Sequence, residues 1–341
     1  MQFNPVTEFQ AYPAVSAGIH HVLICLDRSP AAEAALPLAV HLAQQHGASM
    51  TLLHVLESPR GGTGVATDPI EWEAVRQEAR AYLDDLARRI GKRGIIVDPY
   101  VAEGSAGLVV SAVAARLQID LLVLSASGQR GRGGAGMGST AREILEFVRQ
   151  RVLIVPPGAR NTASHLPPRR ILVPLDGSIR AECVLPTALH LARAEDAEIV
   201  VGHVVSDPVR TELLSAPEDL ALVRAVADRM AIRAEEYLER IRTQLTSGGV
   251  RASVATRRDI DHRHGLVALA GAERADLIVI SAHGSICNPR SHFGSVTSYL
   301  LDHAAVPVLM IQDIRDHMSG ALPRQSSRLP PRSVDVDTRA G

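Results

Sequence analysis

The most constraining feature of the chain is an internal repeat. Segment 21–29 reads His-Val-Leu-Ile-Cys-Leu-Asp-Arg-Ser, and segment 170–178 reads Arg-Ile-Leu-Val-Pro-Leu-Asp-Gly-Ser. Further along, segments 120–128 and 276–284 share the pattern Asp-Leu-x-Val-x-Ser-Ala-x-Gly, and a Gly-Ser pair follows each of them at the same distance. A fixed spacing between repeated motifs indicates two copies of one fold.

Within each copy, apolar runs alternate with segments of helical periodicity. Short, continuous apolar strands separated by helices predict a parallel sheet with right-handed crossovers and helices on both faces. The fold class is therefore α/β, with two repeated doubly wound domains, each built on a five-stranded parallel sheet. The strands are expected near 21–26, 49–56, 95–102, 120–125, 152–156, 170–175, 198–204, 250–256, 276–281 and 307–311, and the helices of the first copy near 30–46, 69–91, 106–117 and 139–149.

The repeat also predicts the domain boundaries. With 341 residues, the chain is long enough for two domains that each bury a core. The C-terminal segment is rich in Arg, Pro and Ser, a composition that favours disorder. The expected organisation is an N-terminal tail at 1–18, a first domain at 19–157, a linker at 158–168, a second domain at 169–313 and a disordered tail at 314–341.

The composition argues against several kinds of partner. The net charge is −1 and no basic run is present, so nucleic acid is not expected. Lys92 is the only lysine and no glycine-rich loop precedes it, which excludes a Walker A motif. No apolar stretch is long enough to span a bilayer, and no export signal is recognisable. The three cysteines are far apart in sequence, which fits a reducing cytoplasm.

A serine, a glycine and a Gly-Ser pair follow the fourth strand of each copy at identical spacing. Glycine lets backbone amides approach an anion, and the amides at a helix N-terminus favour phosphate. The serine of the Gly-Ser pair is expected to cap the helix and to donate to a phosphate oxygen. The carboxyl ends of parallel strands are also where such sheets bind ligands. The positions are Ser125, Gly128, Gly138 and Ser139 in the first copy and Ser281, Gly284, Gly294 and Ser295 in the second.

The same residues also have a purely structural interpretation. Glycines occur in tight turns and serines cap helices in proteins that bind no ligand. Arg130 and Arg132, on the first of these loops, are either phosphate ligands or exposed surface charges. His54 and His203 recur in the repeat and are expected to be buried, hydrogen-bonded core residues.

This arrangement resembles the universal stress protein family, whose nucleotide-binding members carry Gly-x2-Gly-x9-Gly-[Ser/Thr] after the fourth strand. The spacing is kept in both copies, with Ser125 and Ser281 in place of the first glycine. The Pro-Leu-Asp-Gly-Ser sequence at 174–178 and the His-Val pair after the second strand are further features of that family. The resemblance covers about 20–157 and 169–312 and implies an adenine nucleotide α-hydrolase-like fold.

The resemblance also implies a ligand, which is ATP with or without Mg²⁺. Asp27 and Asp176 would contact the adenosine moiety, and the backbone at Val55 and Val204 would meet adenine. Ser125 and Ser281 lie beside the residues expected to hold phosphate. Those residues are Gly128, Gly138, Ser139 and Thr140 in the first copy and Gly284, Gly294, Ser295 and Val296 in the second.

No catalytic set accompanies these motifs. The chain has no Gly-x-Ser-x-Gly elbow and no recognisable catalytic lysine. His283, Cys287 and His292 share a loop, but a fourth ligand is missing, so no metal site is expected. The leading hypothesis is a cytoplasmic stress-response protein that acts by regulated binding of an adenine nucleotide. The alternatives are a scaffold that binds proteins but no nucleotide, and a slow ATPase.

The resemblance further implies an assembly. The last strands of the two copies, at 152–155 and 308–311, would pair the domains into an internal pseudo-dimer, and this arrangement is compatible with a homodimer. The expected partners are an adenine nucleotide and a protein that the sequence does not identify, without nucleic acid or membrane.

Overall fold

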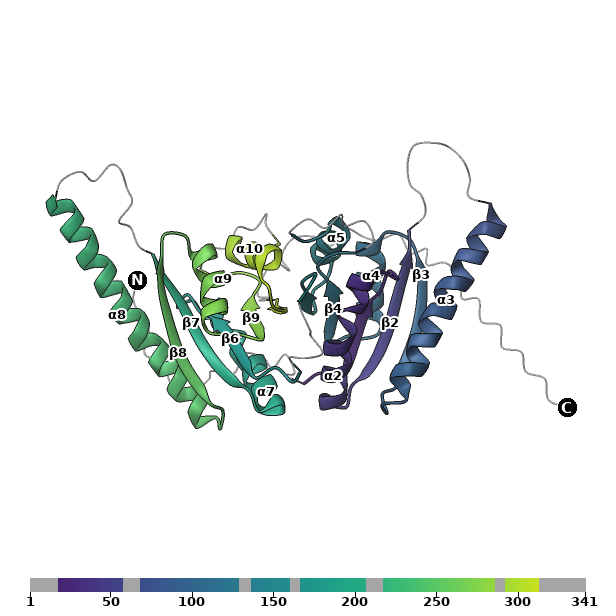
Figure 1. Cartoon of the computed structure of the whole chain (residues 1–341), viewed down its shortest axis with the longest axis horizontal. Helices are drawn as coiled ribbons and strands as arrows, with labels where there is room; N and C mark the ends of the chain where they lie inside the picture. The colour runs from purple at the N-terminus through teal and green to yellow at the C-terminus, as the bar shows by residue number, and fades with distance from the viewer. Residues whose placement is uncertain are drawn as a thin grey trace.

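We describe the fold from a computed structural model of the whole chain (Figure 1). The structure describes residues 18–57, 68–128, 136–159, 166–206, 217–285 and 292–312, and in the segment 217–220 the backbone alone. Most of the predicted tails, at 1–18 and 314–341, and much of the predicted linker lie outside these residues.

Ten strands of the described residues form the centre of the molecule. The first copy contributes β1 (His21–Cys25), β2 (Ser49–Leu56), β3 (Val97–Glu103), β4 (Leu121–Ser125) and β5 (Arg151–Val155). The second copy contributes β6 (Arg170–Pro174), β7 (Glu198–Ser206), β8 (Ala252–Asp259), β9 (Leu277–Ser281) and β10 (Val308–Ile311). Each predicted strand is present, with ends shifted by up to three residues.

The strands join into one sheet in the order β3-β2-β1-β4-β5-β10-β9-β6-β7-β8. Within each copy all pairs are parallel, as the sequence predicts. At the centre β5 and β10 pair antiparallel, with Leu309 opposite Leu153. This β5–β10 pairing, which we call the seam, confirms that the last strands of the copies join the two domains.

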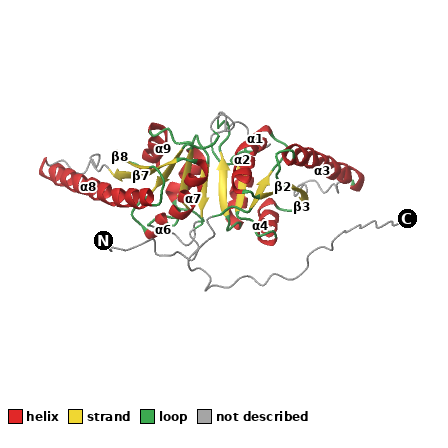
Figure 2. Cartoon of the chain, turned by 90° about the horizontal axis from the view of Figure 1, so that it is seen from below, coloured by secondary structure: helices red, strands yellow, loops and turns green. Residues whose placement is uncertain are grey.

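Helices cover the sheet on both sides (Figure 2). In the first copy they are α1 (Pro30–Glu33), α2 (Leu36–His46), α3 (Pro69–Gly91), α4 (Ala106–Arg116) and α5 (Ser139–Phe147). In the second copy they are α6 (Ile179–Glu182), α7 (Leu185–Glu195), α8 (Pro217–Ser247), α9 (His262–Ala272) and α10 (Ser295–His303).

The single helix expected at 30–46 is wrong in one respect, because it is divided into α1 and α2 at positions 34–35. Pro37 is the second residue of α2. Its ring removes a backbone donor and clashes with the carbonyl one turn earlier, so a helix starts at this proline more easily than it continues through it. The second copy is divided in the same way before Pro186.

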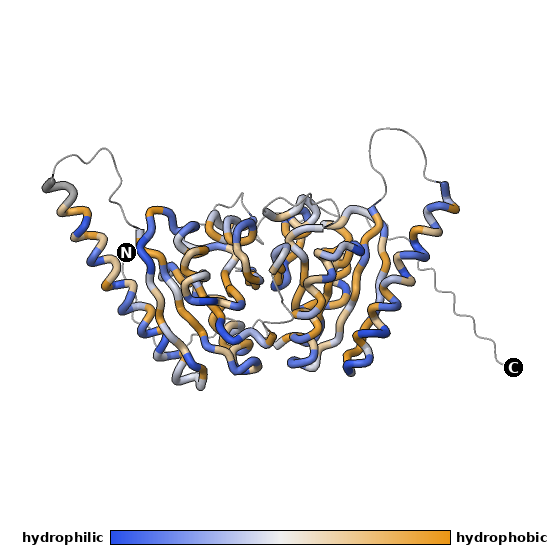
Figure 3. Tube along the Cα trace, in the orientation of Figure 1, coloured by the Kyte–Doolittle hydropathy of each residue, from blue (hydrophilic) through white to orange (hydrophobic). Residues whose placement is uncertain are grey.

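Two layers of apolar side chains enclose the sheet. One layer contains buried residues of α2, α3, α7 and α8, and the other contains those of α4, α5, α9 and α10. The central strands are correspondingly apolar along their length (Figure 3). This double covering explains why the strands are continuous apolar runs rather than alternating ones.

The two copies are related by an approximate twofold arrangement about the seam. Figure 1 shows α2 and α7 together below the seam and α5 and α10 together above it, with α3 and α8 on the outer flanks. The helices α5 and α10 are the next helices in the chain after the carboxyl ends of β4 and β9. Both candidate sites therefore lie at the edge of the sheet where α5 and α10 meet.

Candidate functional site

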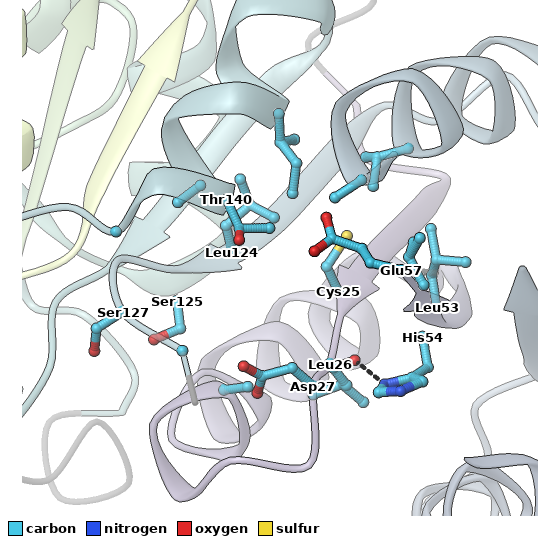
Figure 4. A pocket seen from close by; sticks show the side chains of 18 of the residues that line it. Cys25, Leu26, Asp27, Leu53, His54, Glu57, Leu124, Ser125, Ser127 and Thr140 are labelled. Atoms are coloured by element: carbon cyan, nitrogen blue, oxygen red, sulfur yellow. Dashed lines mark hydrogen bonds between the residues drawn. The ribbon is translucent and has the colours of Figure 1, made fainter. Parts of the chain in front are cut away.

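A cavity of about 330 Å³ opens at the carboxyl ends of the first-copy strands (Figure 4). It lies between β1, β2 and β4 and the helices α4 and α5. All seven site residues predicted for the first copy line it, although they are spread over more than one hundred positions of sequence. They are Asp27, Val55, Ser125, Gly128, Gly138, Ser139 and Thr140.

Asp27 is held in place by the turn that follows β1. Its Oδ1 accepts a hydrogen bond of 3.0 Å from the Ser29 amide, and the Ser29 hydroxyl in turn caps α1 by accepting one from Ala32. A side chain at Gly128 would collide with the Asp27 carboxylate. The close approach of the β4 loop to this carboxylate therefore favours glycine at 128, because a side chain there would push the carboxylate aside.

The N-terminus of α5 faces the cavity without a side-chain cap. Gly138 occupies the cap position, with φ −65° and ψ 158°, and Gly294 does the same for α10. The expectation that Ser139 and Ser295 cap these helices is wrong, because each is the first helical residue instead. Since a glycine cap offers no side-chain oxygen, the first-turn amides have no capping side chain among the described residues and can receive an anion.

Ser125 brings a hydroxyl with no partner to the same cavity. Its Oγ is buried and makes no hydrogen bond to any described residue. The equivalent Ser281 donates to the His283 carbonyl at 2.6 Å, and its own carbonyl accepts from Thr297 at 2.9 Å. A buried hydroxyl without a partner is unfavourable, so a ligand that accepts its hydrogen bond would be stabilised.

His54 and Cys25 line the cavity as neutral groups. Because a carbonyl accepts only, His54 Nδ1 donates to the Leu26 carbonyl at 2.6 Å, and burial is the main cause that lowers the pKa of this histidine. His203 makes the equivalent bond to Leu175 at 2.7 Å, which confirms the predicted hydrogen bonds of both histidines, although His54 is buried and His203 only partly so. Burial raises the pKa of the Cys25 thiol to about 12, which keeps it protonated.

Two charged residues stand beside the cavity. Glu57 and Arg28 both line it, and no sequence motif marks either residue as part of a site. Arg28 has a left-handed backbone, with φ 66°, and its guanidinium pairs with Glu78 at 3.2 Å. The equivalent position in the second copy is Gly177, with φ 78°. The shared backbone angle shows that the turn demands this conformation, for which only glycine is unstrained.

The second copy arranges its predicted residues in the same way. Asp176 accepts hydrogen bonds from the amides of Ser178 at 2.9 Å and Ser285 at 2.7 Å, and a side chain at Gly284 would collide with its carboxylate. Burial favours a higher pKa for Asp176, but the hydrogen bonds from Ser178 and Ser285 outweigh it and lower the pKa. Of the remaining residues, Gly294 is the cap of α10, and Ser295 and Val296 are its first two helical residues.

The two copies differ where adenine is expected. Val55 is half-buried at the wall of the first cavity. Val204 is only 3% exposed, and a side chain added to Gly265 of α9 would lie 2.6 Å from its Cγ1. Because α9 packs closely on Val204, this position is more enclosed in the second copy than in the first.

Three residues considered in the sequence analysis lie where the structure gives no description. Arg130, Arg132 and Cys287 lie outside the described residues. Within the described ranges no group of three or more metal-ligating side chains is present. In those ranges, none of the helices combines the length and hydropathy needed to cross a bilayer.

Comparison with known proteins agrees with the repeat. The model of the universal stress protein family matches the chain twice, at residues 18–156 and 168–312. A universal stress protein of Mycolicibacterium smegmatis is 24% identical over 314 residues, which cover 87% of this chain and 98% of that protein. A universal stress protein of Synechocystis is 25% identical over 151 residues, 40% of this chain and 98% of its own length.

A solved structure shares the fold. A universal stress protein from Archaeoglobus fulgidus superposes with a TM-score of 0.63 at 16% identity, over 86% of this chain and 98% of that one. The two family matches lie one after the other and together span most of the sequence. The chain therefore belongs to the universal stress protein family, as a tandem member with two such domains.

Proposed function

We propose that the cavity of the first domain binds ATP or a related adenine nucleotide, and that the protein acts in a stress response through this binding rather than through catalysis. The observation that carries the proposal is the convergence of the seven predicted residues on one cavity. Its volume lies in the range of pockets that hold small ligands, about 300–1,000 Å³.

The phosphate end of the ligand would lie at the N-terminus of α5. Ser139 and Thr140, which follow the cap residue Gly138, present first-turn amides, and the helix dipole favours negative charge there. The unpartnered Ser125 hydroxyl supplies a further donor. Mg²⁺ would be bound with the phosphates rather than by a preformed cluster of side chains.

The adenosine end would lie toward β1 and β2. The Asp27 carboxylate accepts hydrogen bonds only, which suits the ribose hydroxyls or the amino group of adenine. Val55 and Val110 provide apolar walls for a planar base. The close approach of Gly128 to Asp27 leaves no room for a competing side chain between them.

One feature of the cavity supports binding rather than turnover. The Cys25 thiol stays protonated and is a poor nucleophile. We also propose that the protein acts in the cytoplasm, on the strength of its widely separated cysteines.

We propose that the second domain binds nucleotide more weakly than the first. Its motif residues have the same places, but Val204 is enclosed and the Ser281 hydroxyl is already engaged. A ligand there would have to displace packed groups, whereas in the first domain it would satisfy an unpaired one.

The test begins with the freshly purified chain. It is denatured, and any released nucleotide is identified and counted by mass spectrometry, followed by calorimetric titration with ATP and Mg²⁺. About one nucleotide per chain, lost in Asp27→Ala but retained in the exposed control Asp98→Ala, is the expected result. Neither released nucleotide nor binding on titration would favour the scaffold, and sustained phosphate release sensitive to Asp27→Ala would favour the slow ATPase.

A further inference from the structure

A carboxylate of the second domain reaches the loop that precedes α5 of the first. Asp302, in α10, accepts a hydrogen bond of 2.9 Å from the Met137 amide. The same oxygen, Oδ1, accepts one of 2.5 Å from Nη2 of Arg142 in α5. The Asp302 side chain is 19% exposed, so water competes little for these bonds.

These contacts fix the residue just before the cap of α5. The Met137 amide is held by Asp302, and its carbonyl accepts from Nε of Arg142 at 3.3 Å. The next amide, of Gly138, donates to the Ala126 carbonyl at 2.7 Å. The two residues before α5 are thus held by hydrogen bonds to both domains, Gly138 to the first domain and Met137 to the second.

The sequence allows the ion pair between Asp302 and Arg142 in one direction only. In the repeat, Asp302 corresponds to Glu146, and Arg142 corresponds to Ser298. Ser298 carries no charge, so the reverse ion pair, from Glu146 to the start of α10, cannot form. The arrangement is therefore not a consequence of the twofold relation between the domains.

We propose that Asp302 is a positioning residue for the phosphate end of the first-domain cavity, so that nucleotide binding in one domain depends on contact with the other. This inference rests on the proposed function. By binding the Met137 amide, Asp302 fixes the backbone at Met137 and Gly138, and so fixes the position of the first-turn amides of α5 that would bind phosphate. Arg142 neutralises the carboxylate, so the tether adds no net negative charge near the ligand.

The experiment follows hydrogen exchange of the amides at 136–142 in the full chain, without ligand and with increasing ATP and Mg²⁺. Protection of these amides by ATP reports affinity at the first site alone, whatever the second site binds. The variants are Asp302→Ala, Asp302→Asn and, as matched control at the equivalent position, Glu146→Ala. Thermal melting of each variant shows that it is folded.

Asp302→Ala is expected to raise the exchange rate at Met137 without ligand and to weaken ATP binding about tenfold, the scale of a hydrogen bond to a charged group. Asp302→Asn keeps an oxygen that can accept from Met137, so it should recover part of the affinity, and Glu146→Ala should match the wild type. Tighter binding by Asp302→Asn would overturn the proposal, because Asp302 would then act by repelling phosphate.

The failures of the two proposals are distinguishable. A wild-type chain without ATP protection at 136–142 would overturn binding at the first site, and this inference with it. A wild type that binds, together with an Asp302→Ala variant of unchanged affinity or unchanged exchange at Met137, would overturn the role of Asp302 alone.

Discussion

The imidazole rings of His46 and His190 stack against each other where α2 meets α7, with centroids 5.0 Å apart and His190 Nε2 3.2 Å from His46 Nδ1. In the repeat, His190 corresponds to His41 and Glu195 corresponds to His46. The twofold-related contact is accordingly between His41 and Glu195, at 2.7 Å. One side of the domain contact is thus a histidine–carboxylate pair, and the other is a pair of histidines.

Acid should weaken the fold through this histidine pair. Burial, and then the positive charges of neighbouring groups, lower the pKa of His46 from 6.5 to about 4, and burial lowers the pKa of His190 as well. As pH falls from 6.5 toward 4, His46 therefore binds a proton in the unfolded chain but not in the folded chain. The free energy of unfolding should fall by about 1–2 kcal/mol over this window for a partly solvated ring. The groups facing the pair are His20, His41, Arg151 and Arg193.

Urea denaturation between pH 4.5 and 7.5 measures this dependence. His46→Gln should flatten it, while the exposed and distant control His292→Gln should leave it unchanged. Asp176, whose pKa is lowered from 3.8, acts in a separate window, because its contribution is lost only as pH falls below that value. An equal slope in His46→Gln and wild type would contradict the assignment.

Arg28→Gly should stabilise the protein although it removes an ion pair. The left-handed backbone of Arg28 costs about 1 kcal/mol in a residue with a side chain, whereas its exposed pair with Glu78 contributes a few tenths of that. Thermal melting should show a higher midpoint for Arg28→Gly and a lower one for the reverse exchange, Gly177→Arg. Arg28→Ala keeps the strain and should gain nothing, so a gain there would point to another cause.

Ser125 and Ser281 should respond in opposite ways to the same substitution. Ser125→Ala removes a buried hydroxyl without a partner and should stabilise the ligand-free protein by up to about 1 kcal/mol. Ser281→Ala breaks a bond to the His283 carbonyl and should destabilise it by a similar amount. Chemical denaturation without nucleotide compares the two, and loss of stability in both variants would show that the Ser125 hydroxyl already has a partner.

Gly128 and Gly138 should differ in their tolerance of alanine. An added side chain at Gly128 would displace the Asp27 carboxylate and weaken its hydrogen bond to the Ser29 amide, so Gly128→Ala should lose about 1–2 kcal/mol. The nearest atom to an added Cβ at Gly138 is the Ala126 carbonyl oxygen at 3.6 Å, so Gly138→Ala should lose no more than the difference in capping, about 0.5–1 kcal/mol. Equal losses by denaturation would refute the steric argument.

Most of the fold can be predicted from the repeat in the sequence. Because the two copies share their strand pattern, the five parallel strands of each copy could be predicted, and the shared motifs located the ends of β1 and β4. The break before Pro37 could also have been foreseen, since the residue type forces it. The cap at Gly138 could not, because a shift of one residue depends on backbone angles that the sequence does not show.

The residues missed at the site are those that depend on contact between distant segments. Asp302 meets Arg142 from 160 positions away, and no local pattern marks either residue as part of a site. The sequence shows that Arg28 stands where the second copy has Gly177. The left-handed backbone of Arg28, however, is imposed by the turn and cannot be predicted from the residue type. The unpartnered hydroxyl of Ser125 likewise emerges only when the packing around it is known.

The seam between β5 and β10 determines how the contact between the domains depends on protein concentration. Two separate chains joined by such a contact would come apart on dilution. Here the strands belong to one chain, and the short segment between the two domains keeps them at an effective concentration on the order of millimolar. The contact between the domains, and with it the reach of Asp302 to Met137, should therefore be the same whether the cell holds few molecules of the protein or many.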